Sequence, residues 1–210
     1  MHLDSRRLSK HPQTVEVTLL FSDVVGSTEL TERLGDLEAY HLIRHFCVAV
    51  QERALACGGE ALELRGDGTL IAFSTPKDAL VCAAAVQRSC SRDGRLAIRT
   101  GVHAGMALRV ADGYFGRAVI AAVRIAECAR PNEILVSSEL VHRLDDCSGF
   151  PIGRTQSLRL KGFAEPLRVC SLDWWNDEER REHHPFRQDI PALLPRTWEA
   201  LPDRASISAH

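Results

Sequence analysis

The sequence predicts an α+β fold: a ferredoxin-like βαββαβ core with extra strands and helices, and a mixed, mostly antiparallel sheet with helices on one face. Two observations predict this fold. Short apolar segments with strand composition alternate with longer segments of helical periodicity, and two adjacent strand segments flank the tight turn "RGDG". The length of 210 residues, 45% of them hydrophobic, suits one globular domain with a tail.

The first half of the core contains a strand, a helix and a hairpin. Residues 15–22 are apolar and β-branched, and a Gly-Ser-Thr turn just after them opens a short helical segment. A helix is predicted over residues 37–57, where apolar residues recur at helical spacing before a Gly-Gly stop. Residues 60–64 and 69–73 form the two strands of the hairpin.

The second half of the core adds a capped helix and a strand. Thr75 is predicted to cap a helix, with Pro76 at the first helical position and Asp78 completing a capping box. That helix runs to about Cys90, and residues 96–103 form the next strand.

Further elements extend this core. We expect a strand at 106–110, a helix at 116–129, a strand at 133–137, a short helix at 138–144 and a closing pair of strands at 157–161 and 167–172. The folded domain therefore spans residues 15–172, after an N-terminal extension at 1–14. Residues 173–210 are charged and Pro-rich, which predicts a partly disordered C-terminal tail.

Composition and charge exclude several classes of partner. The net charge is −2, so nothing favours nucleic acid or an anionic membrane surface. No stretch approaches the ~20 uncharged residues of a membrane span, and the N-terminus lacks the apolar core of a secretory signal. The cysteines are scattered without C-x-x-C spacing, which favours free thiols in a reducing compartment. We therefore expect a cytoplasmic protein without a membrane span.

Two acidic residues are brought together by the predicted topology. In a ferredoxin-like sheet the first and third strands are antiparallel neighbours, so the end of one lies beside the start of the other. Asp23 leaves the first strand, and Asp67 lies in the hairpin turn that enters the third. Like charges so close are costly unless a cation lies between them. The pair is a candidate site for two Mg²⁺ or Mn²⁺ ions, although each Asp alone is also a common turn or capping residue.

A turn suited to anions follows Asp23 directly. Gly26, Ser27 and Thr28 lead into the segment "TELTERL", and the free N–H groups of such a helix N-terminus bind phosphate. The carboxylate repels the anion that the turn attracts, and a metal ion carrying a phosphate reconciles the two. We therefore predict that Asp23 holds metal and that the turn holds phosphate.

Five segments resemble those of one known family. The segments "FSDVVGSTEL", "ELRGDGTLIAF", "GYFGRAVIAAVRIAECA", "NEILVSS" and "LRLKGFAEPLRV" occur in the order found in class III adenylate/guanylate cyclase catalytic domains. The resemblance covers about residues 15–172. It implies a head-to-tail homodimer with active sites at the subunit interface, two divalent metal ions, and conversion of ATP or GTP to cAMP or cGMP and pyrophosphate.

The resemblance also implies roles for individual residues near the first strand. Asp23 and Asp67 resemble the metal ligands, and the backbone of Val24 resembles an additional ligand. The turn from Val25 to Thr28 resembles the phosphate-binding turn.

Two basic residues later in the chain resemble catalytic residues. Arg124 resembles the arginine that the partner chain presents to the phosphates, and Lys161 resembles the lysine that reaches the terminal phosphates. Cations there would neutralise the charge that develops as the 3′-oxygen attacks the α-phosphorus and pyrophosphate leaves. Taken without the resemblance, Arg124 also suits a solvated helix face and Lys161 a surface charge at a strand end.

The base-reading positions depart from the adenylate cyclase pattern. Adenylate cyclases carry Lys three residues before the Gly of the hairpin turn, where this chain has Glu63. A carboxylate only accepts hydrogen bonds, which suits the N1–H and N2–H₂ donors of guanine rather than adenine N1. The partner position, an Asp in adenylate cyclases, falls at Gly113, and Tyr114 or Arg117 is a candidate donor to guanine O6. Glu63 equally suits the open face of an edge strand, so ATP and GTP both stay open.

A second departure lies in the predicted helix at 116–129. Four residues before Arg124 the family places an Asn that orients the ribose, and Ile120 occupies that position. Isoleucine offers no hydrogen bond, and losing one transition-state contact costs ~10²–10³ in rate. Val123 also stands where a small residue usually precedes the arginine.

Two functions of different classes are therefore open. The first is an active class III nucleotide cyclase. The alternative is a cyclase-homology domain of low or no activity that binds nucleotide or serves as a dimerising regulatory module. Ile120, Glu63 and Gly113 favour the alternative, whereas the retained acidic and basic residues oppose it. A diguanylate cyclase or polymerase-like palm is disfavoured, because the hairpin lacks a GG-[DE]-E-F turn.

Overall fold

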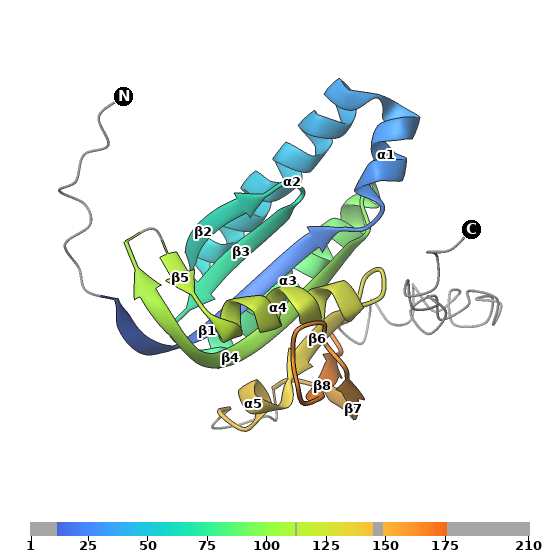
Figure 1. The fold of residues 1–210 in the computed structure, drawn as a ribbon. Helices are drawn as coiled ribbons and strands as arrows, with labels where there is room; N and C mark the ends of the chain where they lie inside the picture. Colours follow the sequence, from blue (N-terminus) through green and yellow to red (C-terminus); the bar gives the residue numbers. More distant parts are fainter. Residues whose placement is uncertain (1–11, 112, 145–148, 176–210) are drawn as a thin grey trace, which may run out of the picture. The chain divides into compact units, whose positions relative to one another are not determined.

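The computed structural model describes residues 12–111, 113–144 and 149–175, which form one sheet and the helices packed on it (Figure 1). In chain order the elements are β1 (Gln13–Val24), α1 (Ser27–Leu34), α2 (Asp36–Ala56), β2 (Glu60–Arg65), β3 (Gly68–Phe73), α3 (Pro76–Asp93), β4 (Ile98–Val110), β5 (Gly113–Phe115), α4 (Arg117–Cys128), β6 (Ile134–Ser137), α5 (Ser138–Val141), β7 (Ile152–Leu158) and β8 (Leu167–Leu172). The expected N-terminal extension and C-terminal tail lie almost wholly outside the described residues.

The order of the strands confirms the predicted α+β, ferredoxin-like core. The sheet runs β2-β3-β1-β4-β6-β8-β7, and β5 pairs with the end of β4. β1 is antiparallel to both of its neighbours, β3 and β4, while β4 and β6 are parallel. The first and third strands are therefore adjacent, as predicted, and the extra strands continue the sheet beyond β4.

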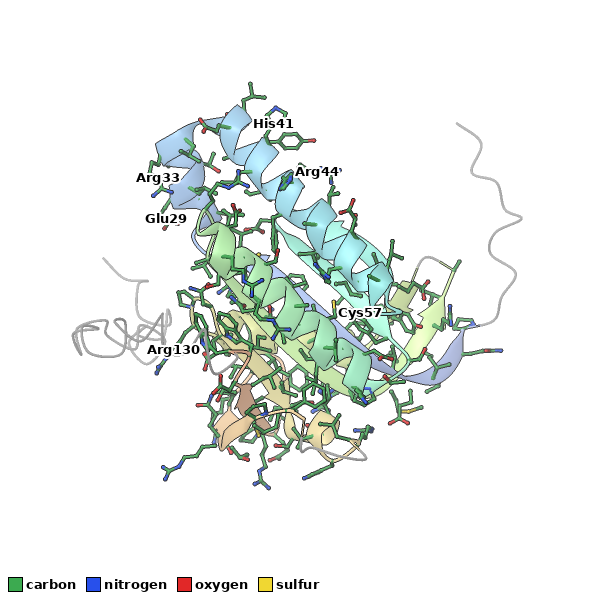
Figure 2. The ribbon with its side chains drawn as sticks, turned by 180° about the vertical axis from the view of Figure 1, so that it is seen from behind. Glu29, Arg33, His41, Arg44, Cys57 and Arg130 are labelled. Carbon is green, nitrogen blue, oxygen red and sulfur yellow. The ribbon has the colours of Figure 1, made fainter. Side chains whose placement is uncertain are left out.

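Helices cover both faces of this sheet (Figures 1 and 2). Helices α2 and α3 form the layer expected on one face. Helix α4 adds to this expectation, because it lies on the opposite face against β1 and β4. Alternate side chains of β1 point to α4, and they join one apolar cluster with Ala118, Ala122 and Ala126 of that helix. Because β1 is covered on both sides, all its residues from Val17 to Val24 are buried.

Local sequence signals placed the start of α3 correctly. The Thr75 hydroxyl accepts a hydrogen bond from the Asp78 amide at 3.1 Å and donates one to the Asp78 carboxylate at 2.6 Å. Pro76 is the first helical residue, where its missing N–H costs nothing. A cap of this kind typically contributes about 1 kcal/mol to stability.

Two strand predictions need correction. The segments at 96–103 and 106–110 form one continuous strand, β4, which pairs with β1 without a break. Gly105 inside it serves close packing, since a Cβ there would be 2.9 Å from Nε2 of His103 and 3.4 Å from Cβ of Ala118. The strand expected at 157–161 is β7, which ends at Leu158. Leu160 is buried in an apolar cluster although it lies beyond the strand. Its apolar character therefore reflects packing and not strand pairing.

Two further expectations concern thiols and membrane spans. Within the described residues, no helix combines the length and apolar character needed to cross a membrane. The six described cysteines are free thiols, as expected, and Cys47, Cys82 and Cys170 are buried. Cys147 lies outside the described residues.

A glycine in β4 lets α4 lie directly on the sheet. A Cβ at Gly101 would be 2.4 Å from the carbonyl oxygen of Ala122 and 2.4 Å from the amide nitrogen of Ala126. Both atoms belong to helix backbone, which cannot rotate away as the end of a side chain can. The position of α4 therefore depends on the absence of a side chain at this residue.

We expect Gly101→Ala to lower the free energy of unfolding by about 1–3 kcal/mol, because α4 must move away from the sheet to admit a methyl group. Urea denaturation followed by circular dichroism measures this change. Gly149→Ala is the matched control, since a Cβ at Gly149 meets no atom within 4 Å. Equal stability of the two variants would contradict the close packing of α4.

Candidate active site

The pairing of β1 with β3 places Asp23 beside the hairpin turn. Asp23 lies opposite Gly68 in the register, and Asp67 is the residue before Gly68. Gly68 also leaves room for its neighbours, because a Cβ there would be 2.4 Å from the Phe21 ring and 3.3 Å from Oδ1 of Asp23. The Asp23 carboxylate is thus held at the edge of the core, with 8% of the residue exposed.

The two carboxylates interact. Burial raises the pKa of Asp23, and both the charge of Asp67 and a hydrogen bond with it raise that pKa further, while Arg99 lowers it. The predicted meeting of the two acids at one end of the sheet is therefore found in the structure. Among the described residues no third Asp, Glu, His or Cys joins them to form a larger metal-binding cluster.

Arg99 is the partner of Asp23 that sequence reasoning missed. Its Nε and Nη2 donate hydrogen bonds to Oδ2 of Asp23 at 3.0 and 2.7 Å. Arg99 lies opposite Asp23 in the β1–β4 register, and its Nη1 also donates to the carbonyl oxygen of Glu127 at 3.4 Å. The periodicity of the sequence places residue 99 in a strand, but it does not indicate which residue of the first strand lies opposite.

The turn after Asp23 opens into a hollow. Gly26 has φ +66° and precedes α1, whose first residues have no side-chain cap in the described structure. Val25 donates its N–H to the carbonyl of Ala97 at 2.9 Å, so the N–H groups left for an anion begin beyond Val25. A cavity of about 340 Å³ is lined by Ser27, Thr28, Thr31, Tyr40, Ile43, Arg44, Gly66 and Asp67. One cavity is therefore lined by the turn before α1, by Asp67 of the hairpin and by Arg44 of α2, which sequence reasoning had not predicted.

The predicted basic residues lie on other elements. Arg124, on α4, donates to the Glu127 carboxylate at 2.5 Å rather than to Asp23 or Asp67 in the described structure. Arg117, the first residue of α4, lies over the Phe163 ring at 4.7 Å. Phe163 belongs to the β7–β8 connection that carries Lys161, so this contact brings the connection against α4. Ile120 is half-exposed on the same helix.

One predicted base-reading position, Gly113, lies near the strand that carries the other, Glu63. Glu63 pairs with Leu70 in the β2–β3 ladder, and its side chain lies outside the described part of the structure. Gly113 begins β5, and a Cβ there would be 3.8 Å from the Leu62 side chain, next to Glu63. Strands β2 and β5 are therefore neighbours although they are far apart in the sheet order.

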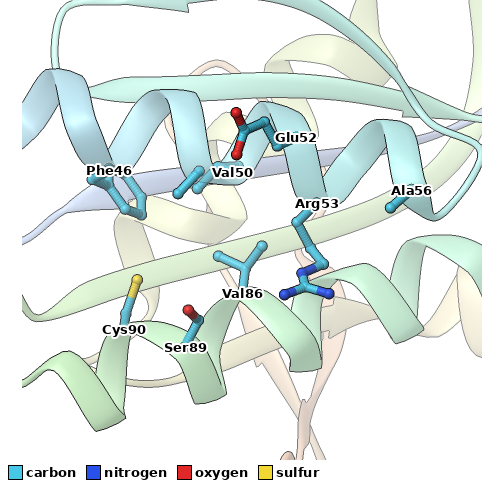
Figure 3. Close-up of a pocket in the computed structure, with 9 residues that line it drawn as sticks. Phe46, Val50, Glu52, Arg53, Ala56, Val86, Ser89 and Cys90 are labelled. Atoms are coloured by element: carbon cyan, nitrogen blue, oxygen red, sulfur yellow. The ribbon is translucent and has the colours of Figure 1, made fainter.

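A second hollow lies between α2 and α3, on the face opposite α4 (Figure 3). It has a volume of about 230 Å³ and is lined by Phe46, Ala49, Val50, Glu52, Arg53, Ala56, Val86, Ser89 and Cys90. It contains none of the predicted site residues, whereas the cavity beside Asp67 contains several of them.

Comparison with known proteins finds a family match over most of the chain. The family described as the adenylate and guanylate cyclase catalytic domain matches residues 9–172. An uncharacterized protein of Mycobacterium tuberculosis is 32% identical over 154 residues, which are 72% of this chain and 40% of that protein. A pH-sensitive adenylate cyclase of the same species is 27% identical over 162 residues, 75% of this chain and 41% of that protein. The chain thus spans about two fifths of the length of these relatives.

Solved structures share the fold. The adenylyl cyclase CyaB from P. aeruginosa has a TM-score of 0.69 at 24% identity, and the match covers 80% of this chain and 98% of that one. The guanylyl cyclase Cya2 has a TM-score of 0.68 at 21% identity, with 78% and 94% covered. Likeness at this level of identity establishes the architecture.

Replacing Asp67 by Asn tests the electrostatic repulsion between Asp23 and Asp67. At neutral pH we expect Asp67→Asn to stabilise the protein in chelator-containing buffer by roughly 0.5–1 kcal/mol, because it removes a charge that raises the pKa of Asp23. An acidic group whose pKa is raised in the folded state lowers the free energy of unfolding at pH values above that raised pKa. It has no such effect at pH values below the pKa of the unfolded state, where the group is protonated in both states. The gain should therefore vanish near about pH 3, where Asp23, whose pKa is raised, is protonated.

Thermal unfolding at the two pH values measures the effect of Asp67→Asn. Glu165→Gln makes the same change of charge on an exposed residue of the β7–β8 connection and serves as the control. A loss of stability at neutral pH would mean that Asp67 supports Asp23 instead of repelling it.

Proposed function

The chain belongs to the adenylate and guanylate cyclase catalytic domain family, and we propose that it is an active nucleotide cyclase that converts ATP or GTP to a 3′,5′-cyclic nucleotide and pyrophosphate. The observation that carries this proposal is the pair Asp23 and Asp67, which interact beside a cavity that also contains Ser27 and Thr28 of the turn. A domain that binds neither metal ions nor nucleotide has no use for two acids whose mutual repulsion costs stability.

The donor set suits divalent cations. Carboxylate and carbonyl oxygens are the ligands that Mg²⁺ and Mn²⁺ prefer, and we assign Asp23, Asp67 and the backbone of Val24 to this role. Two such ions bound there supply the positive charge that an attacking 3′-oxygen and a departing pyrophosphate require. Until cations bind, Arg99 neutralises part of the charge on Asp23 through its two hydrogen bonds.

Phosphate groups are held by the turn and by basic side chains. Ser27 and Thr28 offer N–H groups at the start of α1, and Arg44 lines the same cavity. We assign Arg124 and Lys161 to the charge on the leaving pyrophosphate, where a positioned cation lowers the barrier. In the described structure Arg124 pairs with Glu127 of its own chain and not with Asp23 or Asp67. This supports a role for Arg124 in the active site of a neighbouring subunit.

A homodimer with head-to-tail subunits accounts for this separation. Each active site would combine the acids of one subunit with Arg124 and Lys161 of the other. The β4–β5 hairpin supports such a contact, because Met106, Leu108 and Phe115 are 54%, 36% and 67% exposed there. Leu108 pairs with Phe115 across the hairpin, and Met106 lies two residues along the same strand, so the three apolar side chains share one face.

The base is either adenine or guanine. Glu63 favours guanine as a hydrogen-bond acceptor, and Gly113 provides no side chain that would select one base. Arg117 is engaged with Phe163 in the single chain, so it reaches a base only if that contact opens.

The alternative function is a regulatory cyclase-homology domain with little turnover, which binds nucleotide and dimerises. One observation favours it: Ile120 is half-exposed where the family places a ribose-orienting Asn, and it offers no hydrogen bond. The two functions differ in whether cyclic nucleotide is formed.

Incubation with Mn²⁺ and either ATP or GTP, with both cyclic products assayed, tests the proposal. We expect product in the wild type and none in Asp23→Ala or Arg124→Ala. An equal mixture of the two inactive variants should regain roughly one quarter of wild-type activity, because half of the dimers are mixed and each contains one intact site.

Three other outcomes would each contradict a different part of the proposal. A folded dimer that makes no product with either nucleotide would favour the regulatory function. Product that survives Asp23→Ala would show that the site is misplaced, and a mixture without activity would contradict shared active sites.

Ile120→Asn should raise kcat by roughly ten- to a hundred-fold, because it restores a hydrogen bond to the ribose in the transition state. The exposed position lets Asn enter without loss of core packing. Val48→Asn on α2, which is 40% exposed and lies outside the site, is the control for a general effect of the substitution. Unchanged kcat in Ile120→Asn would mean that another group already orients the sugar.

A further inference from the structure

We propose that Glu127 is a positioning residue that restrains Arg124 in the resting subunit, so that the arginine must leave this carboxylate before it reaches a triphosphate. The inference rests on the proposed function of Arg124. The contact is direct: Nη1 of Arg124 lies 2.5 Å from Oε2 of Glu127, one helical turn along α4. A charge-assisted hydrogen bond of this kind is stronger than one between neutral groups.

Glu127 is held in place from a second direction. Its carbonyl oxygen accepts a hydrogen bond from Nη1 of Arg99, the same arginine whose other nitrogens bind Asp23. The residue therefore lies between the arginine that neutralises the buried acid and the arginine proposed to act on phosphate. The backbone of Glu127 is thereby tied to Arg99 of β4, while its carboxylate is engaged with Arg124.

The charge of Glu127 acts against the reaction in two ways. It competes with phosphate oxygens for the donors of Arg124, and it places a negative charge close to where a triphosphate must come. Both effects are limited by solvent, because the side chains of Arg124 and Glu127 are 34% and 41% exposed. Exposed ion pairs of this kind contribute little, so the restraint is a modest and salt-sensitive one.

A purely structural i,i+3 pair makes a different prediction. Such a pair would stabilise α4 slightly, and its loss would change thermal stability without changing the contribution of Arg124 to turnover. A pair that holds Arg124 in a productive position would lower kcat when broken. The sign of the change in kcat/KM, and its dependence on Arg124, therefore distinguish restraint from both of these roles.

The test compares kcat and KM of the wild type with those of Glu127→Gln, which keeps the shape of the side chain and removes its charge. We expect kcat/KM to rise roughly two- to five-fold at low salt, and the gain to shrink as salt is added. In the Arg124→Ala background, where no product is expected, Glu127→Gln should not tighten binding of a 3′-deoxy nucleotide, because the effect passes through that arginine.

Glu60→Gln is the matched control. Glu60 also forms an exposed ion pair with an arginine, at 3.4 Å from Arg109, and it lies on β2 away from α4. The Glu60→Gln substitution should leave kcat/KM unchanged. A decrease in kcat/KM with Glu127→Gln, no change, or tighter nucleotide binding that persists beside Arg124→Ala would each overturn the proposal.

A binding measurement keeps this inference separate from the proposed function. Calorimetry with Mn²⁺ and the 3′-deoxy analogues of ATP and GTP, which cannot cyclise, compares affinities without turnover. If no variant forms cyclic product, the enzymatic function fails, and tighter binding by Glu127→Gln would still support the restraint. If product forms but Glu127→Gln matches the wild type in both assays, the restraint fails and the enzyme stands.

Discussion

The antiparallel pairing of β1 with β3 confines two like charges at one end of a buried sheet, and the candidate site depends on that confinement. The register sets Asp23 opposite Gly68 and so brings Asp67 next to a carboxylate that is almost fully buried. Burial of the central strands offsets the cost of this repulsion. Arg99 relieves only part of it, and the pKa of Asp23 stays raised. Acids that were fully neutralised within the chain would have little affinity for a cation.

The candidate residues fall into two sets held by different elements. Asp23, Asp67 and the turn before α1 meet at the end of β1, whereas Arg124 and Arg117 belong to α4, against which the β7–β8 connection with Lys161 lies. The basic set is engaged within its own chain, by Glu127 and by Phe163. Such a division is what a site shared between two subunits requires, since each set must face outward from its own subunit to meet the other. The exposed apolar face of the β4–β5 hairpin is consistent with this arrangement.

Glycines show where sequence patterns and packing diverge. Gly101 and Gly105 lie inside β4, a strand of thirteen residues, and the glycine-containing pattern suggested two shorter strands. Both positions lack a side chain because α4 or a buried histidine occupies the space. In the same way Leu158 and Leu160 alternate as in a strand, although the strand ends between them and both contact one apolar cluster. Alternation reports which side chains are buried, and burial has causes other than strand pairing.

The sequence alone determined the strand that leads to Asp23, the capped start of α3 at Thr75, the hairpin around Asp67 and the adjacency of the two acids. These features depend on local periodicity, on capping chemistry and on a topology that few element orders permit. The tertiary structure decided the pairing of Arg99 with Asp23, the entry of Arg44 into the cavity, the close approach of α4 to Gly101 and the position of Glu127 between two arginines. These depend on the register between strands and on the distance between a helix and a sheet. Both quantities are set by the packing of residues far apart in the chain, and no local pattern encodes them.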